Sequence, residues 1–292
     1  MGEIAELLQP QYLEEVPCNL CARGETVLWA ESGGFRIVRC VGCGLTYVNP
    51  RLNRAGLQKV YGRDYFEMHT ESEALEKRLR MYEIEIRAIE KLAPSGRILD
   101  VGCGGGYFLA RLGSHWERYG TEFSAVAAHA AHKNFGIRVE VGPLPELAYP
   151  DGFFDVVNLR GVIEHFQDPF AYLTAAHRIL KPGGWVIINT PNIESFCARL
   201  YREKFRLVDP RYHIYYFSTR TISRLAEKAG LRVARTRFFY LGTPYAHWTD
   251  ALKITLDLAR LITRGRGAMG PSPAFFDNVV HVYARKEISR GR

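Results

Sequence analysis

Four cysteines near the N-terminus have the spacing of a metal site. Cys18 and Cys21 form one Cys-x-x-Cys pair, Cys40 and Cys43 form a second, and 18 residues separate the pairs. Four thiolates at this spacing can close a tetrahedral zinc shell, which leaves no open position for catalysis. The sequence therefore predicts a structural zinc. Disulfides are the alternative, but the N-terminal residues lack a basic and apolar signal pattern and favour reduced thiols in the cytoplasm.

A glycine-rich segment is the second candidate for chemistry. A short apolar run ends at Asp100, and four glycines follow within five residues, from Gly102 to Gly106. Neither the Gly-x-Gly-x-x-Gly of a dinucleotide site nor the Gly-Lys-Ser/Thr of a phosphate loop is present. Glu122 lies about 20 residues further on, at the end of the next predicted strand, where a carboxylate can bind both hydroxyls of a ribose. These residues fit an adenosine with a charged tail.

The elements that must position these residues alternate along the chain. The hydrophobic pattern predicts strands at 97–101, 119–122, 138–141, 154–159, 185–189, 231–238 and 279–286. It predicts helices at 72–92, 105–112, 125–134, 171–180, 218–229 and 250–263. Such alternation is typical of an α/β fold, a doubly wound, Rossmann-like, mostly parallel sheet of seven strands with helices on both faces. A small zinc ribbon, with two short strands about a Ser-Gly-Gly turn, precedes it.

The charge of the chain is unevenly distributed. Residues 199–292 contain 19 Lys and Arg against 7 Asp and Glu, although the net charge of the whole chain is only +8. A basic C-terminal third favours an anionic partner, such as a phosphorylated metabolite, an acidic lipid surface or nucleic acid, with a solvated basic surface as the alternative. No stretch of about 20 apolar residues appears, so we expect no transmembrane segment and leave peripheral membrane contact open.

Four motifs together resemble the class I S-adenosylmethionine-dependent methyltransferases. In order, they are ILDVGCGGGYF, GTEFS, DGFFDVVNLRGVIEHFQDP and RILKPGGWVIINTPN, and they cover roughly residues 95–240. The cysteine ribbon followed by CGLTYVNP is similar to a bacterial arrangement in which a ribbon precedes a small-molecule methyltransferase. The resemblance implies a ribbon at 1–50, a helical linker or cap at 51–94, and a methyltransferase domain at 95–292 with an insertion at about 240–278.

The resemblance also implies which residues hold S-adenosylmethionine. The glycines let the backbone approach the cofactor, Asp100 orients the turn, Glu122 binds the ribose diol and Phe123 lies against the adenine. Pro143 stands where many family members have an acid, so contact with the adenine there is apolar or through the backbone. The full implied set is Asp100, Gly102, Gly104, Gly106, Glu122, Phe123, Pro143, Leu144, Asn158, Leu159 and Arg160.

Catalysis is expected after the fourth predicted strand of this domain. Glu164 and His165 should face the methyl group, with His165 the first candidate base and His213 the second. Ordinary structural histidines are the alternative for both. Some quinone and phenol O-methyltransferases of the family carry an acid-x-x-Glu-His metal cluster here. Gly161 replaces the first acid, which puts a catalytic metal in doubt.

Two aromatic and basic segments, 201–217 and 240–264, are expected to form a lid over the methyl group. Both follow elements that leave a doubly wound sheet at its ligand edge. In this hypothesis aromatic side chains such as Trp248 cover the acceptor and Arg or Lys side chains hold an anionic group. Packing of an insertion against the sheet is the alternative, which the helical spacing at 251–262 would also explain.

Three functions remain open from the sequence. The first is methyl transfer to a small molecule, a sugar, lipid, phenol or antibiotic-type intermediate, which is anionic or aromatic. The second is a zinc-ribbon ribosomal RNA methyltransferase, although strand four ends in Asn-Leu-Arg-Gly and not in the motif used for exocyclic amines. The third is a non-catalytic cofactor-binding protein, which the intact set of glycines and acids disfavours.

Overall fold

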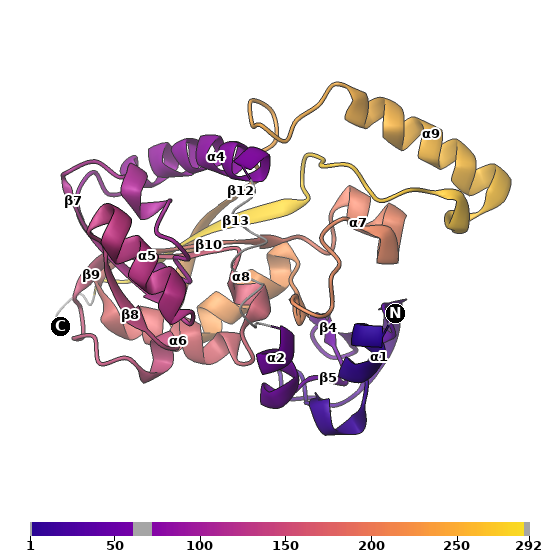
Figure 1. Cartoon of the computed structure of the whole chain (residues 1–292), viewed down its shortest axis with the longest axis horizontal. Helices are drawn as coiled ribbons and strands as arrows, with labels where there is room; N and C mark the ends of the chain where they lie inside the picture. The colour runs from indigo at the N-terminus through magenta and orange to yellow at the C-terminus, as the bar shows by residue number, and fades with distance from the viewer. Residues whose placement is uncertain (1, 61–71, 289–292) are drawn as a thin grey trace.

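A seven-stranded sheet forms the centre of the molecule (Figure 1). The computed structural model describes residues 2–60 and 72–288, so the part of the predicted cap at 61–71 lies outside the described residues. The sheet order is β12-β13-β10-β9-β6-β7-β8. Its strands are β6 (Gly96–Val101), β7 (Trp116–Glu122), β8 (Arg138–Val141), β9 (Phe154–Arg160), β10 (Leu180–Pro191), β12 (Leu231–Arg237) and β13 (Val279–Lys286).

All of these strands run parallel except β13, which pairs antiparallel with both β10 and β12. The strand order reverses between β6 and β9, so the chain leaves these two neighbours in opposite directions across the sheet. In open α/β sheets, ligands bind outside the carboxyl ends of the strands at such a switch point. The predicted fold class is confirmed.

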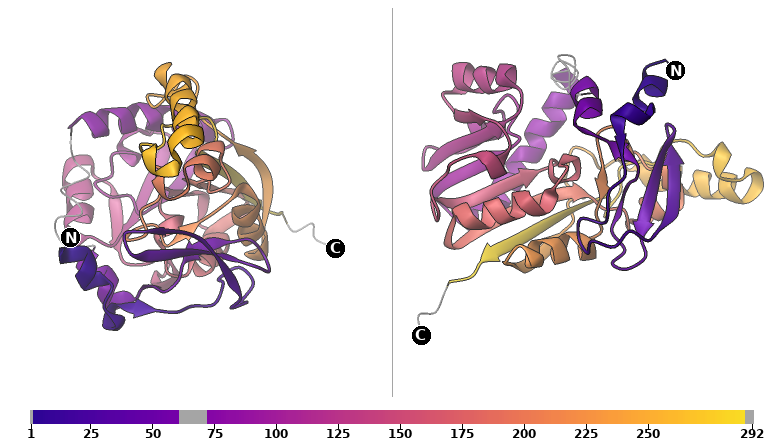
Figure 2. Two further views of the ribbon diagram at one scale, coloured as in Figure 1. Left: turned by 90° about the vertical axis from the view of Figure 1, so that its right-hand side faces the viewer. Right: turned by 90° about the horizontal axis from the view of Figure 1, so that it is seen from below.

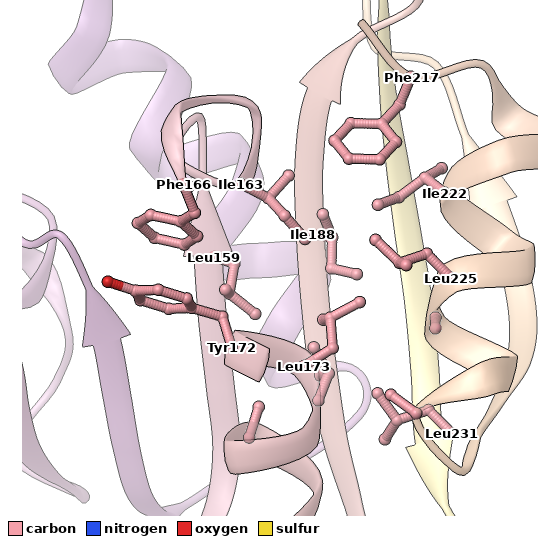
Figure 3. Close-up of a cluster of buried hydrophobic side chains, with 14 of the residues drawn as sticks. Leu159, Ile163, Phe166, Tyr172, Leu173, Ile188, Phe217, Ile222, Leu225 and Leu231 are labelled. Carbon is pink, nitrogen blue, oxygen red and sulfur yellow. The ribbon is translucent and has the colours of Figure 1, made fainter. Parts of the chain in front are cut away.

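Helices cover both faces of the sheet, as the alternation predicts. Helix α4 (Ser72–Glu90) buries Tyr82, Ile86 and Ile89 on one face, and α5 (Ala125–Phe135) packs on β7 and β8. On the other face lie α6 (Pro169–Ile179) and α8 (Thr219–Lys228). Figure 3 shows Ile222 and Leu225 of α8 pointing at the sheet, where they join Leu159 of β9 and Ile188 of β10 in one apolar cluster.

The N-terminal ribbon is a second, four-stranded sheet, and one of its edge strands comes from a much later part of the chain. Its order is β11-β4-β3-β2, from β2 (Thr26–Ser32), β3 (Phe35–Cys40), β4 (Thr46–Val48) and β11 (Tyr215–Tyr216). The two predicted ribbon strands are β2 and β3. A separate two-stranded sheet joins β1 (Leu13–Glu14) to β5 (Arg51–Leu52), and short helices α1 (Gly2–Leu7) and α2 (Arg54–Val60) flank it.

The segment between β12 and β13 forms an arm. Its helix α9 (Thr249–Arg264) extends away from the central sheet in both side views (Figures 1 and 2). The inner side of α9 packs beside α7 (Phe196–Tyr201) on an apolar cluster that includes Trp29 and Phe35 of the ribbon. Among the described residues, no helix is long and apolar enough to cross a membrane.

The structure differs from the sequence prediction at 105–112. The expected helix is absent, and only a 3₁₀ turn at Leu109–Arg111 follows the glycines. Gly106 has a φ of +78°, and Gly113 ends the segment, so six residues remain between the two glycines. The positive φ of Gly106 is outside the helical region, so the helix cannot begin at the predicted position. Phe108, Leu109 and Leu112 are nevertheless buried, which explains their helix-like apolar spacing.

Candidate active site

The candidate site lies where β6, β7, β9 and β10 end, at the reversal of strand order. β6 ends at Val101 and β9 at Arg160, and the two strands are direct neighbours. The glycine turn follows β6, and the Glu164–His165 segment follows β9. Because the strands are parallel, their carboxyl ends bring both segments to the same edge of the sheet.

Three alternating glycines shape the turn after β6, and all have positive φ angles. A Cβ on Gly102 would meet the Val162 side chain at 2.8 Å, and one on Gly106 would meet Ile137 at 2.7 Å. A Cβ on Gly104 would meet nothing within 4 Å. Gly102 and Gly106 are therefore required by packing, whereas Gly104 presents bare backbone to open space, as a ligand-binding turn needs.

The Glu122 carboxylate holds this turn. It accepts hydrogen bonds from the backbone N–H groups of Gly104 (2.8 Å), Phe123 (2.8 Å) and Ser124 (3.0 Å). Two carboxylate oxygens offer about four acceptor positions, so three bonds leave capacity for a ligand hydroxyl. The Phe123 side chain is 64% exposed beside it, which is open to a planar ring.

Asp100 is buried at the end of β6. Asn158 on β9 donates a hydrogen bond of 2.8 Å from Nδ2 to its Oδ1. Burial raises the pKa of Asp100 to about 7, against the lowering effects of Arg160 and Asn158. Asp100 and Asn158 are thus a coupled pair directly beneath the glycine turn.

Leu144 and Leu159 do not line the site with their side chains. Both are fully buried and belong to the apolar cluster between the sheet and α6. The predicted cofactor contact of these two residues is therefore limited to their backbone. Pro143 is half-buried, at the start of the short turn that buries Leu144.

Arg160 belongs to a polar cluster that no motif of the sequence predicts. Its Nη2 donates to the Tyr82 hydroxyl (2.9 Å), and its Nε lies 3.8 Å from Glu85 Oε2. Glu85 also accepts a hydrogen bond of 2.8 Å from Asn189 on β10. Tyr82 and Glu85 both come from α4, so this helix contributes polar side chains to the site as well as apolar ones to the core.

Glu164, His165 and His213 come together, as the sequence predicts. One ligand atom from each lies within 4.8 Å of the others, and the two imidazole ring centroids are 4.7 Å apart. Glu164 is buried, and its Oε2 accepts a hydrogen bond of 3.0 Å from Thr190. Burial raises the pKa of the Glu164 carboxyl, and the charge of His213 opposes that rise.

Backbone carbonyls fix the tautomers of both histidines. His165 Nδ1 lies 3.0 Å from the Tyr212 carbonyl oxygen, and His213 Nδ1 lies 2.8 Å from that of Leu207. A carbonyl oxygen can only accept, so each Nδ1 carries the proton and each neutral imidazole keeps its lone pair on Nε2. These nitrogens can take a proton or bind a cation.

The four ribbon cysteines also converge. Cys18 Sγ lies 3.4 Å from Cys43 Sγ, and Cys21 Sγ lies 3.5 Å from Cys40 Sγ, with all four sulfurs within 4.8 Å of one another. None forms a disulfide. The structure therefore does not contain the disulfides that were the alternative for these four cysteines.

Only one of the two predicted lid segments reaches the cluster of Glu164, His165 and His213. Segment 201–217 brings in His213, but α9 packs on the Tyr201 cluster through Ile254, Leu258 and Leu261. Trp248, at the start of α9, is 86% exposed. Residues 251–262 therefore pack against α7, as the alternative to a lid predicts, and their helical apolar spacing is explained by that contact.

Comparison with known proteins gives one matching family. A family model described as a methyltransferase domain matches residues 66–236, which is more than half of the chain. A crystal structure of an S-adenosylmethionine-dependent methyltransferase from Thermotoga maritima superposes with a TM-score of 0.53 at 23% identity, over 79% of this chain and 98% of that one. The structural likeness shows the fold alone.

Curated relatives match over shorter stretches. An uncharacterised protein from Methanocaldococcus jannaschii is 31% identical over 144 residues, which are 49% of this chain and 65% of that protein. A ubiquinone biosynthesis O-methyltransferase from Cereibacter sphaeroides is 39% identical over 104 residues, which are 33% of this chain and 41% of that enzyme. The chain thus spans less than two thirds of the length of these relatives.

Proposed function

We propose that this chain methylates a hydroxyl oxygen of a small molecule. The premise is that the chain belongs to the class I S-adenosylmethionine-dependent methyltransferases. The observation that carries the proposal is the convergence of His165, His213 and Glu164 at the carboxyl end of β9. S-adenosylmethionine supplies an electrophilic methyl group with a neutral leaving group. The residues of the chain then have to hold the acceptor in line and remove its proton.

The two imidazoles favour an oxygen acceptor over a nitrogen acceptor. A neutral amine attacks through its own lone pair, whereas a hydroxyl must lose its proton as the new bond forms. His165 and His213 both keep the Nε2 lone pair, because their Nδ1 protons are committed to backbone carbonyls. Either nitrogen can accept the hydroxyl proton. Glu164 beside them stabilises the imidazolium that results.

The glycine turn fits the cofactor. Gly104 leaves open the space that a Cβ would fill, and the Glu122 carboxylate retains acceptor capacity for a ribose diol. Asp100 and Asn158 lie beneath the turn, where they would orient the amino acid end through hydrogen bonds. Phe123 would lie against the adenine. These assignments follow from the family and are proposals for this chain.

We further propose that the four cysteines hold a structural zinc ion. With zinc–sulfur bonds of about 2.3 Å, a tetrahedral shell places sulfurs about 3.8 Å apart. The Sγ distances of 3.4 and 3.5 Å are close to that value, and the donor set is the all-thiolate one of structural sites.

The placement of the ribbon supports a small-molecule substrate over ribosomal RNA. The ribbon is packed against the catalytic part of the chain through β4 and β11, and Arg220 and Lys228 of α8 donate to the carbonyls of Cys43 and Leu20. Two cations near the ribbon thus bind its own backbone. The relative from Cereibacter sphaeroides is, by its name, an O-methyltransferase of ubiquinone biosynthesis, which supports an oxygen acceptor.

The experiment measures transfer of labelled methyl from S-adenosylmethionine to catechols, hydroxyquinones, hydroxylated sugars and a ribosomal RNA fragment. We expect transfer to a small hydroxyl compound. His165→Ala or His213→Ala should reduce turnover by about 10²–10⁴-fold with nearly unchanged cofactor affinity. His129→Ala, on the exposed side of α5, is the matched control and should retain full activity.

Two results would contradict the proposal. Transfer to RNA or to amines alone would exclude the hydroxyl acceptor. Full activity of both histidine variants would exclude them as bases. Loss of turnover on chelation, restored by Mg²⁺, would instead assign the Glu164 cluster to a cation despite the glycine at position 161.

A further inference from the structure

Helix α9 has two apolar sides, and only one of them is covered. The inner side packs Ile254, Leu258 and Leu261 against the cluster around Tyr201. The rest of the helix extends away from the central sheet, as the view from below shows (Figure 2, right). An ordinary surface helix buries one apolar stripe and presents a polar face to water.

The outer side of α9 is apolar and exposed. Trp248 is 86% exposed, Leu252 53%, Leu256 49% and Ile262 84%. At about 100° per residue these four side chains lie within an arc of about 120°. We call them the outer stripe. Its width matches that of the stripe by which amphipathic helices bind an apolar phase.

The exposed charges of α9 are all basic. Its two acids point inward. Asp250 accepts hydrogen bonds from the Tyr240 hydroxyl and the His247 backbone N–H, and Asp257 accepts them from the Tyr201 hydroxyl and the Arg260 guanidinium. Both are buried, Asp257 completely. Arg260 and Arg264 are exposed and Lys253 is half-buried, and all three lie along one edge of the outer stripe, at about 80–120° from Leu252. Arg260 is ion-paired with Asp257, so Arg264 and Lys253 carry most of the free charge of this basic edge.

We propose that the outer stripe of α9 and its basic edge dock this protein on the surface of an anionic lipid membrane. The apolar side chains would enter the boundary between headgroups and acyl chains, and the basic edge would meet anionic headgroups. A tryptophan at the end of such a helix suits this interface because its ring is apolar with a polar N–H. No acid of α9 is exposed, so a second copy of this helix would offer its basic edge no counter-charge.

The root of the arm adjoins the candidate site. Phe239, just after β12, packs edge-on against His281, with 4.6 Å between the ring centroids. His281 is the β13 partner of Asn189, which donates to Glu85 in the polar cluster of the site. A membrane held by α9 would therefore lie near the polar cluster of the site. The docking surface itself does not depend on which acceptor is methylated.

The test is flotation of the full chain with two kinds of vesicle, one of phosphatidylcholine alone and one that also contains phosphatidylglycerol. We expect binding to the anionic vesicles, weakened by high salt, and little binding to the neutral ones. Leu252→Asp/Leu256→Asp should weaken binding by about 10-fold or more, because two leucines lose their transfer into the apolar phase. Fluorescence of Trp248 should shift to the blue on binding in the unchanged protein.

Val27→Asp/Leu28→Asp is the matched control, since these side chains of β2 are 55% and 50% exposed and the charge change is the same. It should bind vesicles like the unchanged protein. The proposal is overturned if anionic vesicles are not bound, or if the α9 variant and the control bind equally. Sedimentation without lipid gives a third decisive outcome. If the unchanged protein is a dimer and Leu252→Asp/Leu256→Asp is a monomer, a second copy of this chain covers the outer stripe and the membrane proposal is overturned. Melting temperature and S-adenosylmethionine affinity should be the same for all three proteins.

Discussion

At the scale of single residues, Glu122 combines two roles that can be separated by mutation. Its carboxylate holds the glycine turn through three backbone N–H groups, and we propose that it also binds the ribose. Glu122→Ala should weaken S-adenosylmethionine binding by about 10–100-fold, because hydrogen bonds to a charged group are lost. Calorimetric titration measures this. Glu117→Ala, an exposed acid at the other end of β7, should bind like the unchanged protein.

Asp100 should give the protein a pH-dependent stability. Its pKa is raised to about 7 by burial, whereas an unfolded aspartic acid titrates near pH 4. Between these values the folded state binds more protons at Asp100 than the unfolded state, so the contribution of Asp100 to stability is largest below about pH 4 and is lost as the pH rises to about 7.

Melting temperature against pH, without cofactor, checks this expectation. Asp100→Asn should flatten the decline but not abolish it, because the pKa values of Glu85 and Glu164 are also raised by burial. Asp151→Asn, at an exposed position, should leave the profile unchanged. A profile that Asp100→Asn does not alter would contradict the buried proton.

The residues at strand ends could be placed from the sequence, but their partners from α4 could not. Asp100 and Glu122 follow apolar runs, and parallel strands bring such positions to one edge. Glu85 lies on the same side of α4 as Tyr82 and Ile86. An acid on the apolar side of a helix is seldom buried without a polar partner, so the sequence did indicate that Glu85 has one. The identity of that partner depends on how α4 is oriented on the sheet, and the local sequence pattern does not determine this orientation.

At the scale of elements, the ribbon and the His213 loop form one unit. β11 pairs with β4 through Tyr215 and Tyr47, and His213 lies two residues before β11. Cys43→Ser should lose the zinc, release β4 and so free the His213 loop. We expect faster amide exchange at 213–217 and lower turnover, with S-adenosylmethionine affinity within about threefold, because the glycine turn is on other strands.

Elemental analysis and hydrogen exchange by mass spectrometry measure these effects. Cys197→Ser, a buried cysteine outside the ribbon, is the control and should keep one zinc per chain. Unchanged exchange at 213–217 in a zinc-free Cys43→Ser protein would show that the ribbon does not support the loop.

Elements whose pattern is local were predictable, and those defined by long-range contact were not. α8 was placed by its Ser218 cap and by Gly230, and both are observed at its ends. β11 was missed because two residues that pair with a strand about 170 positions earlier carry no periodic signal. The predicted lid was wrong for α9 for a related reason. The same apolar spacing serves any partner, and here the partner is α7.

At the scale of the whole molecule, the sheet order and the charge distribution follow from the chain as a whole. Alternating strands and helices were enough to predict a doubly wound sheet, because crossover connections leave few topologies. The basic C-terminal third was visible in the composition. The sequence did not show what this charge is for, because only the structure shows that Asp250 and Asp257 are buried while Arg260 and Arg264 of α9 are exposed.

The central claim is that S-adenosylmethionine lies on the glycine turn after β6. Gly104 and Gly136 allow a matched comparison, since their φ angles are +52° and +65° and a Cβ on either meets no protein atom within 4 Å. Alanine at each should therefore strain the backbone similarly, and both variants should lose a similar part of their melting temperature.

The most direct measurement is calorimetric titration of both variants with S-adenosylmethionine. Gly104→Ala should weaken binding by at least about tenfold, because its methyl group enters the space that the cofactor would occupy. Gly136→Ala, at the end of α5, should bind with the affinity of the unchanged protein. Equal affinity in the two variants, or no binding to the unchanged protein, would contradict the account.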